Sequence, residues 1–133
     1  MRELSGAWKY HPGDHADWAL ATQEVEEILL PGVPLGFSTN FQYQLCEFDL
    51  LPGDTILILS DGLPERLNNE DEAFGYPRTE ALFKKSGDRA PKEICAHLAL
   101  GGEGWAQGRL QEDDITFVVM KVKAQERVIG QER

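Results

Sequence analysis

Two acidic positions in this sequence stand at the ends of apolar segments. Asp61 directly follows the run ILILS, and Asp113 begins the pair of aspartates that precedes the run ITFVVM. An ionised carboxylate at the end of a buried strand is costly unless it is paired, hydrogen-bonded or bound to a cation. If the two strands lie side by side and antiparallel, the end of one meets the start of the other. Asp61 and Asp113 would then converge, and hard oxygen ligands of this kind suit Mg²⁺ or Mn²⁺.

Each of these positions also fits a purely structural role. An Asp-Gly pair after a strand is more often a turn than a ligand, and two aspartates before a strand are often a solvated strand end. The joint occurrence of both motifs favours the metal site. The segment HPGDHAD, residues 11–17, also gathers ligand-type side chains, but we expect it to be a solvated loop. Ser60 has no His-Asp partner in a recognisable arrangement, so a nucleophilic serine is not supported.

The elements that must position the two aspartates are strands. Residues 55–60 and 114–122 are apolar on both faces, which predicts two interior strands. Residues 41–50 alternate between apolar and polar side chains, which is typical of a strand with one buried face. Residues 51–54, LPGD, carry turn chemistry. We therefore expect residues 41–60 to form a hairpin.

Two helices are expected between the strands. The first runs over residues 77–86, and the second begins near Pro91 and should fray or break at Gly101-Gly102, with Trp105 anchoring its end. Residues 1–22 show no sustained period and should be irregular with one short strand, whereas residues 23–30 fit a strand or a single helical turn equally well. The order of strands, helices and strand indicates an α+β fold.

Composition excludes several classes of function. The chain has 133 residues, of which 41% are hydrophobic and 27% charged, and a net charge of −10. These values are typical of one globular domain and make nucleic acid and anionic membrane surfaces unfavourable partners. No apolar run is long enough to span a bilayer, and two cysteines, Cys46 and Cys95, form no CxxC motif. We expect a cytoplasmic protein.

Five sequence blocks occur in an order that resembles a known family. They are VPLG at 33–36, CEFDLLPGD at 46–54, LILSDGLPE at 57–65, AFG at 73–75 and DDIT at 113–116. Together they resemble the second half of the bacterial PPM-type, metal-dependent protein serine/threonine phosphatase domain of the stage II sporulation protein E kind. The pairing of a Ser-Asp-Gly strand end with an Asp-Asp-Ile-Thr strand start is more specific than either motif alone.

The resemblance implies a fold, an activity and a set of partners. The expected architecture is a partial or compact version of the two-sheet αββα phosphatase sandwich, with antiparallel sheets flanked by helices. Asp61 and Asp113 are implied as ligands of one of two Mn²⁺ or Mg²⁺ ions that activate a water for attack on a phosphoserine or phosphothreonine. Asp114, Gly62 and Glu65 belong to the motifs without being expected as direct ligands. The implied partner is a phosphorylated protein of bacterial signalling, such as an anti-sigma-factor antagonist.

One element of that family is absent from the sequence. Family members carry an upstream Asp-x-Ser-Gly-His-Gly element whose Asp bridges both metals, and no such element occurs here. Two hypotheses follow: an enzyme whose first half lies on another chain or was removed, or a catalytically incomplete module that acts as a protein-binding or dimerising regulator. For the isolated chain we expect weak metal binding, near-background activity and a homodimer, unless residues 1–30 cover the open face.

These expectations divide the chain into three parts. Residues 1–30 are an N-terminal segment of uncertain role, residues 31–124 are the C-terminal half of the phosphatase domain, and residues 125–133 are a frayed tail.

Overall fold

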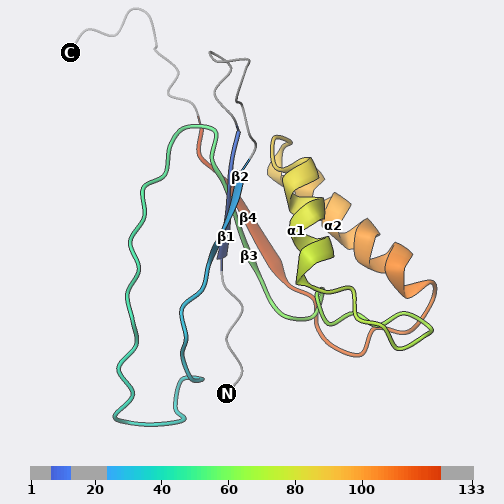
Figure 1. The fold of residues 1–133 in the computed structure, drawn as a ribbon, viewed down its shortest axis with the longest axis horizontal. Helices are drawn as coiled ribbons and strands as arrows, with labels where there is room; N and C mark the ends of the chain where they lie inside the picture. The colour runs from blue at the N-terminus through green and yellow to red at the C-terminus, as the bar shows by residue number, and fades with distance from the viewer. Residues whose placement is uncertain (1–6, 13–23, 124–133) are drawn as a thin grey trace, which may run out of the picture.

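A four-stranded antiparallel sheet with two helices on one face makes up the part of the chain that the structure describes (Figure 1). This structure is a computed structural model, and it describes residues 7–12 and 24–123. The strands are β1 (Ala7–His11), β2 (Glu24–Ile28), β3 (Thr55–Leu59) and β4 (Phe117–Lys121), in the sheet order β2-β1-β3-β4. The helices are α1 (Tyr76–Ser86) and α2 (Pro91–Ala106). The predicted α+β class is confirmed.

The core lies between the sheet and the helices. Leu57 of β3, Tyr10 of β1 and Phe83 of α1 are all fully buried, and the Phe83 ring lies 6.1 Å from the Tyr10 ring and 6.4 Å from that of Trp8. Because side chains alternate along a strand, Leu57 and Leu59 share the face that the helices cover. Each such buried side chain contributes roughly 1.5–3 kcal/mol, so this layer holds β3 in place.

Both predicted helices are present, but the second does not break at its glycines. A Cβ on Gly101 would lie 2.3 Å from Leu82, and one on Gly102 would lie 2.7 Å from Leu63. The glycines therefore let α2 pack closely, and this contact outweighs the helix propensity of about 1 kcal/mol that each glycine loses. Trp105 anchors the helix end as expected, because its Nε1 donates to the carbonyl of Glu72 at 3.0 Å.

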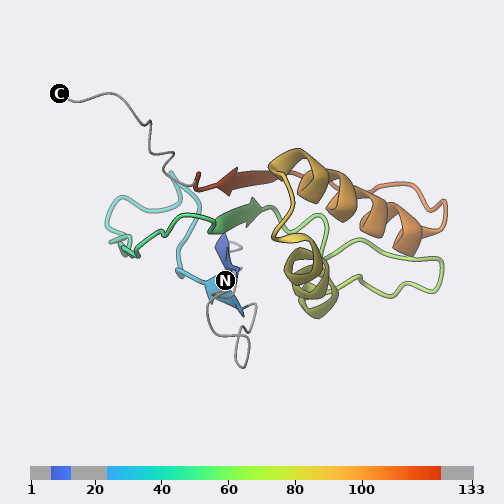
Figure 2. The ribbon, with the colours of Figure 1, turned by 90° about the horizontal axis from the view of Figure 1, so that it is seen from above.

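The predicted hairpin is only half correct. The turn at residues 51–54 is present, with Gly53 at φ 90° and the Asp54 amide donating to the Leu51 carbonyl at 3.0 Å. Residues 41–50, however, form no strand. A strand needs a neighbour for its backbone groups, and both edges of β3 are taken, by β1 and β4. The segment runs instead along the side of the sheet opposite the helices (Figures 1 and 2).

The prediction of two interior strands is correct for β3 and wrong for β4. β4 is the last strand of the sheet in the described residues and begins at Phe117. Ile58, Val118 and Met120 point away from the helices and are 44–49% exposed. An apolar pattern on both faces reports what the sequence is suited to bury. In this structure the helix side of β3 and β4 is largely buried, whereas on the other side Ile56 is 3% exposed and these three side chains are about half exposed. We call Ile58, Val118 and Met120 the outer apolar face.

The N-terminal segment is more regular than expected. β1 is the short strand predicted before residue 22, and residues 24–28 resolve the strand-or-turn ambiguity as β2. β1 pairs with β3, and β2 pairs with β1. Within the described residues the two strands therefore widen the sheet and do not cover the outer apolar face. The expected tail at 125–133 lies outside the described residues. Among the described helices, neither has the length and apolarity that crossing a bilayer requires.

Candidate metal centre

Hydrogen bonds connect the segment that follows β3 to the segment that precedes β4. The Ser60 amide donates to the Thr116 carbonyl at 2.8 Å, and the Thr116 amide donates to Ser60 Oγ at 3.0 Å. The Ser60 hydroxyl in turn donates to the Asp114 carbonyl at 3.3 Å. Ser60 is thus a structural link between the two motifs, and it brings the residues after β3 next to those before β4.

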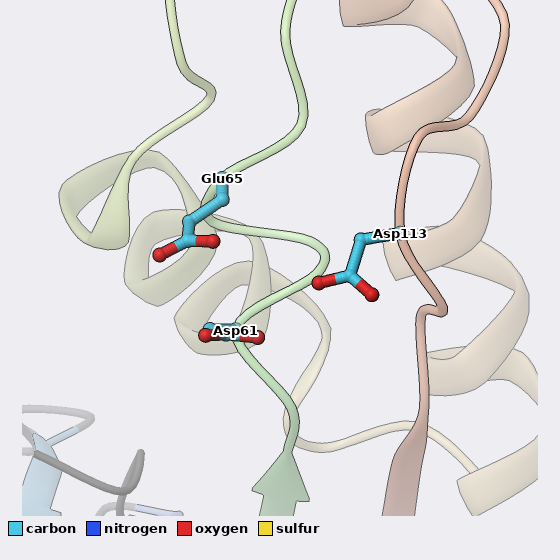
Figure 3. Close-up of side chains that lie close together, drawn as sticks. All are labelled: Asp61, Glu65 and Asp113. Carbon is cyan, nitrogen blue, oxygen red and sulfur yellow. The ribbon is translucent and has the colours of Figure 1, made fainter. Parts of the chain in front are cut away.

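Three carboxylates meet at this junction. One carboxylate oxygen from each of Asp61, Glu65 and Asp113 lies within 4.8 Å of the others, and the three side chains converge from two separate segments of chain (Figure 3). The predicted convergence of Asp61 and Asp113 is confirmed. Asp61 is partly buried, while Glu65 and Asp113 are exposed, so the cluster opens to solvent.

Glu65 is the member of this cluster that the sequence reasoning did not assign as a ligand. Its amide donates to the Asp61 carbonyl at 2.9 Å, which is a single helical turn between residues four apart. Residues at that spacing share one side of a turn. The four-residue separation in SDGLPE is the signal that could have placed Glu65 beside Asp61.

Gly62 allows the two motifs to approach each other. A Cβ on Gly62 would lie 2.1 Å from the carbonyl oxygen of Asp114 and 3.1 Å from Ile115. No side chain fits there without a shift of the backbone. The glycine after Asp61 is therefore required by close packing of the Asp61 turn against the Asp113-Asp114 segment.

A cavity of about 210 Å³ adjoins the carboxylates, and Glu65 and Asp113 belong to its wall together with Arg66 and Arg109. Arg109 donates to Asp71 at 2.6 Å and to Glu112 at 2.8 Å. These hydrogen bonds, first that to Asp71, raise the pKa of Arg109 above its usual value. The site therefore combines an acidic cluster with a permanently charged guanidinium beside it.

The segment of residues 11–17 also has ligand-type side chains, and the structure describes only His11 and Pro12 of it. His11 Nδ1 lies 2.5 Å from Asp54 Oδ1, and the other oxygen of this buried carboxylate accepts from the Leu51 amide at 2.8 Å. His11 is thereby tied to the turn that precedes β3. Residues 13–17 lie outside the described part of the chain.

The donor set suits one small, hard divalent cation. Carboxylates with room for water are the usual ligands of Mg²⁺ and Mn²⁺ in proteins, because these ions keep several of their waters. Exposed carboxylates also gather on protein surfaces without an ion.

A match to a family profile identifies the family of the chain. Residues 6–123 match the profile of the family described as stage II sporulation protein E (SpoIIE). The chain belongs to the SpoIIE family. The matched range includes β1 and β2 as well as the five blocks. No protein of curated function matches the chain in sequence.

Solved structures confirm the fold. The chain is similar to the SiaA-PP2C domain of Pseudomonas aeruginosa, with a TM-score of 0.65 and 18% identity over 90% of this chain and 44% of that one. It is also similar to the PP2C phosphatase domain of the cell fate determinant SpoIIE from Bacillus subtilis, with a TM-score of 0.61 and 22% identity over 90% of this chain and 32% of that one. A second structure of that phosphatase domain gives 0.57 and 17% over 92% and 50%. The chain thus spans half or less of each of these three structures and corresponds to part of the phosphatase sandwich.

Proposed function

We propose that this chain supplies one side of the metal centre of a phosphoprotein phosphatase, with Asp61 and Asp113 as ligands. The observation that supports this most is the convergence of their carboxylates where β3 meets β4, in a chain of the SpoIIE family. Glu65 adds a third oxygen donor beside them. The proposed reaction is hydrolysis of a phosphoserine or phosphothreonine in a bacterial signalling protein. An anti-sigma-factor antagonist is an example of such a substrate protein.

The residues present define what each would do. A Mn²⁺ or Mg²⁺ ion at this position supplies a water of lowered pKa and stabilises negative charge on phosphoryl oxygens. Asp61 and Asp113 would hold the ion from the segments beyond the ends of β3 and β4, Ser60 links those segments, and Gly62 permits their close approach. The solvent-open side of the cluster leaves room for a phosphorylated side chain.

The site is proposed to be completed by a further part of the PP2C fold. Asp61, Glu65 and Asp113 come from one pair of strand ends, whereas the binuclear centre expected from the resemblance also uses the Asp-x-Ser-Gly-His-Gly element, which this sequence lacks. The outer apolar face is 44–49% exposed on Ile58, Val118 and Met120, as expected where a second sheet would pack. By itself the chain should therefore bind a cation weakly and turn over little substrate.

A second candidate function is a catalytically incomplete module that pairs with a copy of itself. The same outer apolar face supports it, because a second copy could cover Ile58, Val118 and Met120. The net charge of −10 on each copy opposes such pairing. The location in the cytoplasm stays a prediction in both cases.

One experiment separates these functions. The purified chain is assayed with Mn²⁺ on a phosphoserine peptide while light scattering measures its mass. We expect turnover far below 1 s⁻¹, since about 1 s⁻¹ is the low end of ordinary enzyme rates. A monomer with ordinary turnover would contradict the incomplete site. An inactive dimer that Val118→Lys converts to monomer would favour the dimerising module over the half-site.

A further inference from the structure

The segment that carries Asp113 has no regular structure to hold it. α2 ends at Ala106, Gln107 adopts a left-handed conformation at φ 49°, and β4 begins only at Phe117. Backbone hydrogen bonds hold the two ends of this connection, from the Arg109 amide to the Ala106 carbonyl at 3.0 Å and from the Ser60 amide to the Thr116 carbonyl at 2.8 Å. Between these ends, side-chain contacts hold the backbone in position. A ligand within such a connection is only as well placed as those contacts allow.

Arg109 makes three of the side-chain hydrogen bonds that hold this connection, more than any other side chain. Its Nη1 donates to the Asn68 carbonyl at 2.7 Å and to Asp71 Oδ1 at 2.6 Å, and its Nη2 donates to Glu112 Oε1 at 2.8 Å. One guanidinium therefore joins the loop that follows Glu65 to the residue that precedes Asp113. A planar group with several fixed donors is suited to hold acceptors in one arrangement.

The connection is fastened a second time through Arg66. Arg66 Nη2 donates to the backbone carbonyl of Arg109 at 2.8 Å, and Gln111 Nε2 donates to the carbonyl of Asp113 at 2.9 Å. Arg66 is the neighbour of Glu65, and Glu112 is the neighbour of Asp113. Each arginine thus links the two segments at a position close to one of the carboxylates.

We infer that Arg109 is a positioning residue for the metal centre, which fixes Asp113 relative to Asp61 and Glu65 without touching the cation. The inference rests on the proposed function and adds a residue to it. Supporting residues of this kind around a metal typically change its affinity by about 10- to 100-fold when they are replaced.

The charge of Arg109 makes the inference testable, because charge and geometry predict opposite effects. Removing a positive charge beside a cation site strengthens cation binding if Arg109 acts only through its field. If Arg109 instead holds Asp113 in place through its hydrogen bonds, removing it weakens cation binding. Arg109→Gln should therefore raise the Kd for Mn²⁺ about tenfold, and Arg109→Lys, which keeps the charge but cannot reach three acceptors, should also raise it.

The measurement is a calorimetric Mn²⁺ titration of the two variants, combined with ¹⁵N relaxation of the metal-free chain. We expect the backbone order parameters of residues 109–114 to fall in Arg109→Gln toward the flexible range, below about 0.6. Arg78→Gln is the matched control: Arg78 donates to the Phe74 carbonyl at 2.9 Å and lies over Trp105. It loses the same charge and a comparable hydrogen bond to a backbone carbonyl, and should lower thermal stability without weakening Mn²⁺ binding.

Unchanged or tighter Mn²⁺ binding in Arg109→Gln would overturn the inference while leaving the proposed function intact. If the unmodified chain binds no Mn²⁺, the proposed function fails, and the relaxation data then decide only the structural part of the inference, which is that Arg109 fixes Asp113 relative to Asp61 and Glu65. Unchanged order parameters in residues 109–114 would then overturn it, and a fall confined to those residues would support it.

Discussion

Replacing either Asp61 or Asp113 by asparagine should abolish Mn²⁺ binding to this chain. Each change removes one anionic ligand from a set of three carboxylates within 4.8 Å of one another, and a hard cation with so few anionic ligands loses most of its affinity when one becomes neutral. The unmodified chain should bind weakly, and calorimetric titration should show no detectable heat of binding for either variant. Glu65→Gln should weaken binding without abolishing it if Glu65 is a third, more exposed donor.

Asp49→Asn provides the control for a general loss of negative charge, because Asp49 is an exposed aspartate outside the cluster. It should leave the Mn²⁺ titration unchanged. Binding that persists in both Asp61→Asn and Asp113→Asn would place the cation elsewhere, with residues 11–17 as the first segment to examine. Tight binding by the unmodified chain would show that the site is more complete than we propose.

Gly62→Ala should both destabilise the fold and weaken the metal site. The new Cβ would meet the Asp114 carbonyl oxygen at 2.1 Å, and this neighbour is backbone that cannot rotate away. Forcing an atom into such a contact typically costs about 1–3 kcal/mol. The relief of the clash must separate the Asp61 turn from the Asp113-Asp114 segment. Chemical denaturation should therefore show reduced stability, and the Mn²⁺ titration should show a raised Kd.

Gly104→Ala is the matched control and should have the opposite sign. A Cβ on Gly104 would meet nothing within 4 Å, and Gly104 lies inside α2. The substitution should stabilise the chain by up to about 1 kcal/mol through helix propensity and leave Mn²⁺ binding unchanged. If Gly62→Ala were as stable as the unmodified chain, the close approach of the two motifs would not be a real constraint.

The parts of the fold that the sequence predicted are those that local chemistry specifies. β3 follows from four consecutive apolar residues after a threonine, and α1 from a proline at its start and two lysines in its last turn. The meeting of Asp61 and Asp113 followed from the pairing of β3 with β4. For β3 and α1 the neighbouring residues carry the whole signal, whereas the pairing of β3 with β4 was an assumption that the structure confirms.

The parts that the sequence did not predict depend on distant neighbours. Residues 41–50 alternate as a strand should, but pattern does not show whether a partner edge is free. Gly101 and Gly102 signal a helix break until Leu82 and Leu63 are seen to fill the space beside them. Whether β4 has a second pairing partner, and whether its outer face is covered, likewise depend on distant parts of the fold that no local pattern reveals.

The site was predicted in the same uneven way. Asp61 and Asp113 stand in motifs at strand ends, so their types and order were informative. Glu65 joins them only through the turn that its amide makes with the Asp61 carbonyl. Arg109 belongs to none of the five blocks, and its contacts with Asp71 and Glu112 reach across 38 and 3 residues of sequence. A role of that kind is visible only in three dimensions.

The most direct test of the account is the position of the ion itself. Crystals of the chain soaked in Mn²⁺ should give an anomalous difference peak within about 2.5 Å of a carboxylate oxygen of both Asp61 and Asp113. That result would show that the two strand ends share one divalent cation. A peak bound elsewhere, with none between Asp61 and Asp113 at saturating Mn²⁺, would contradict the central claim.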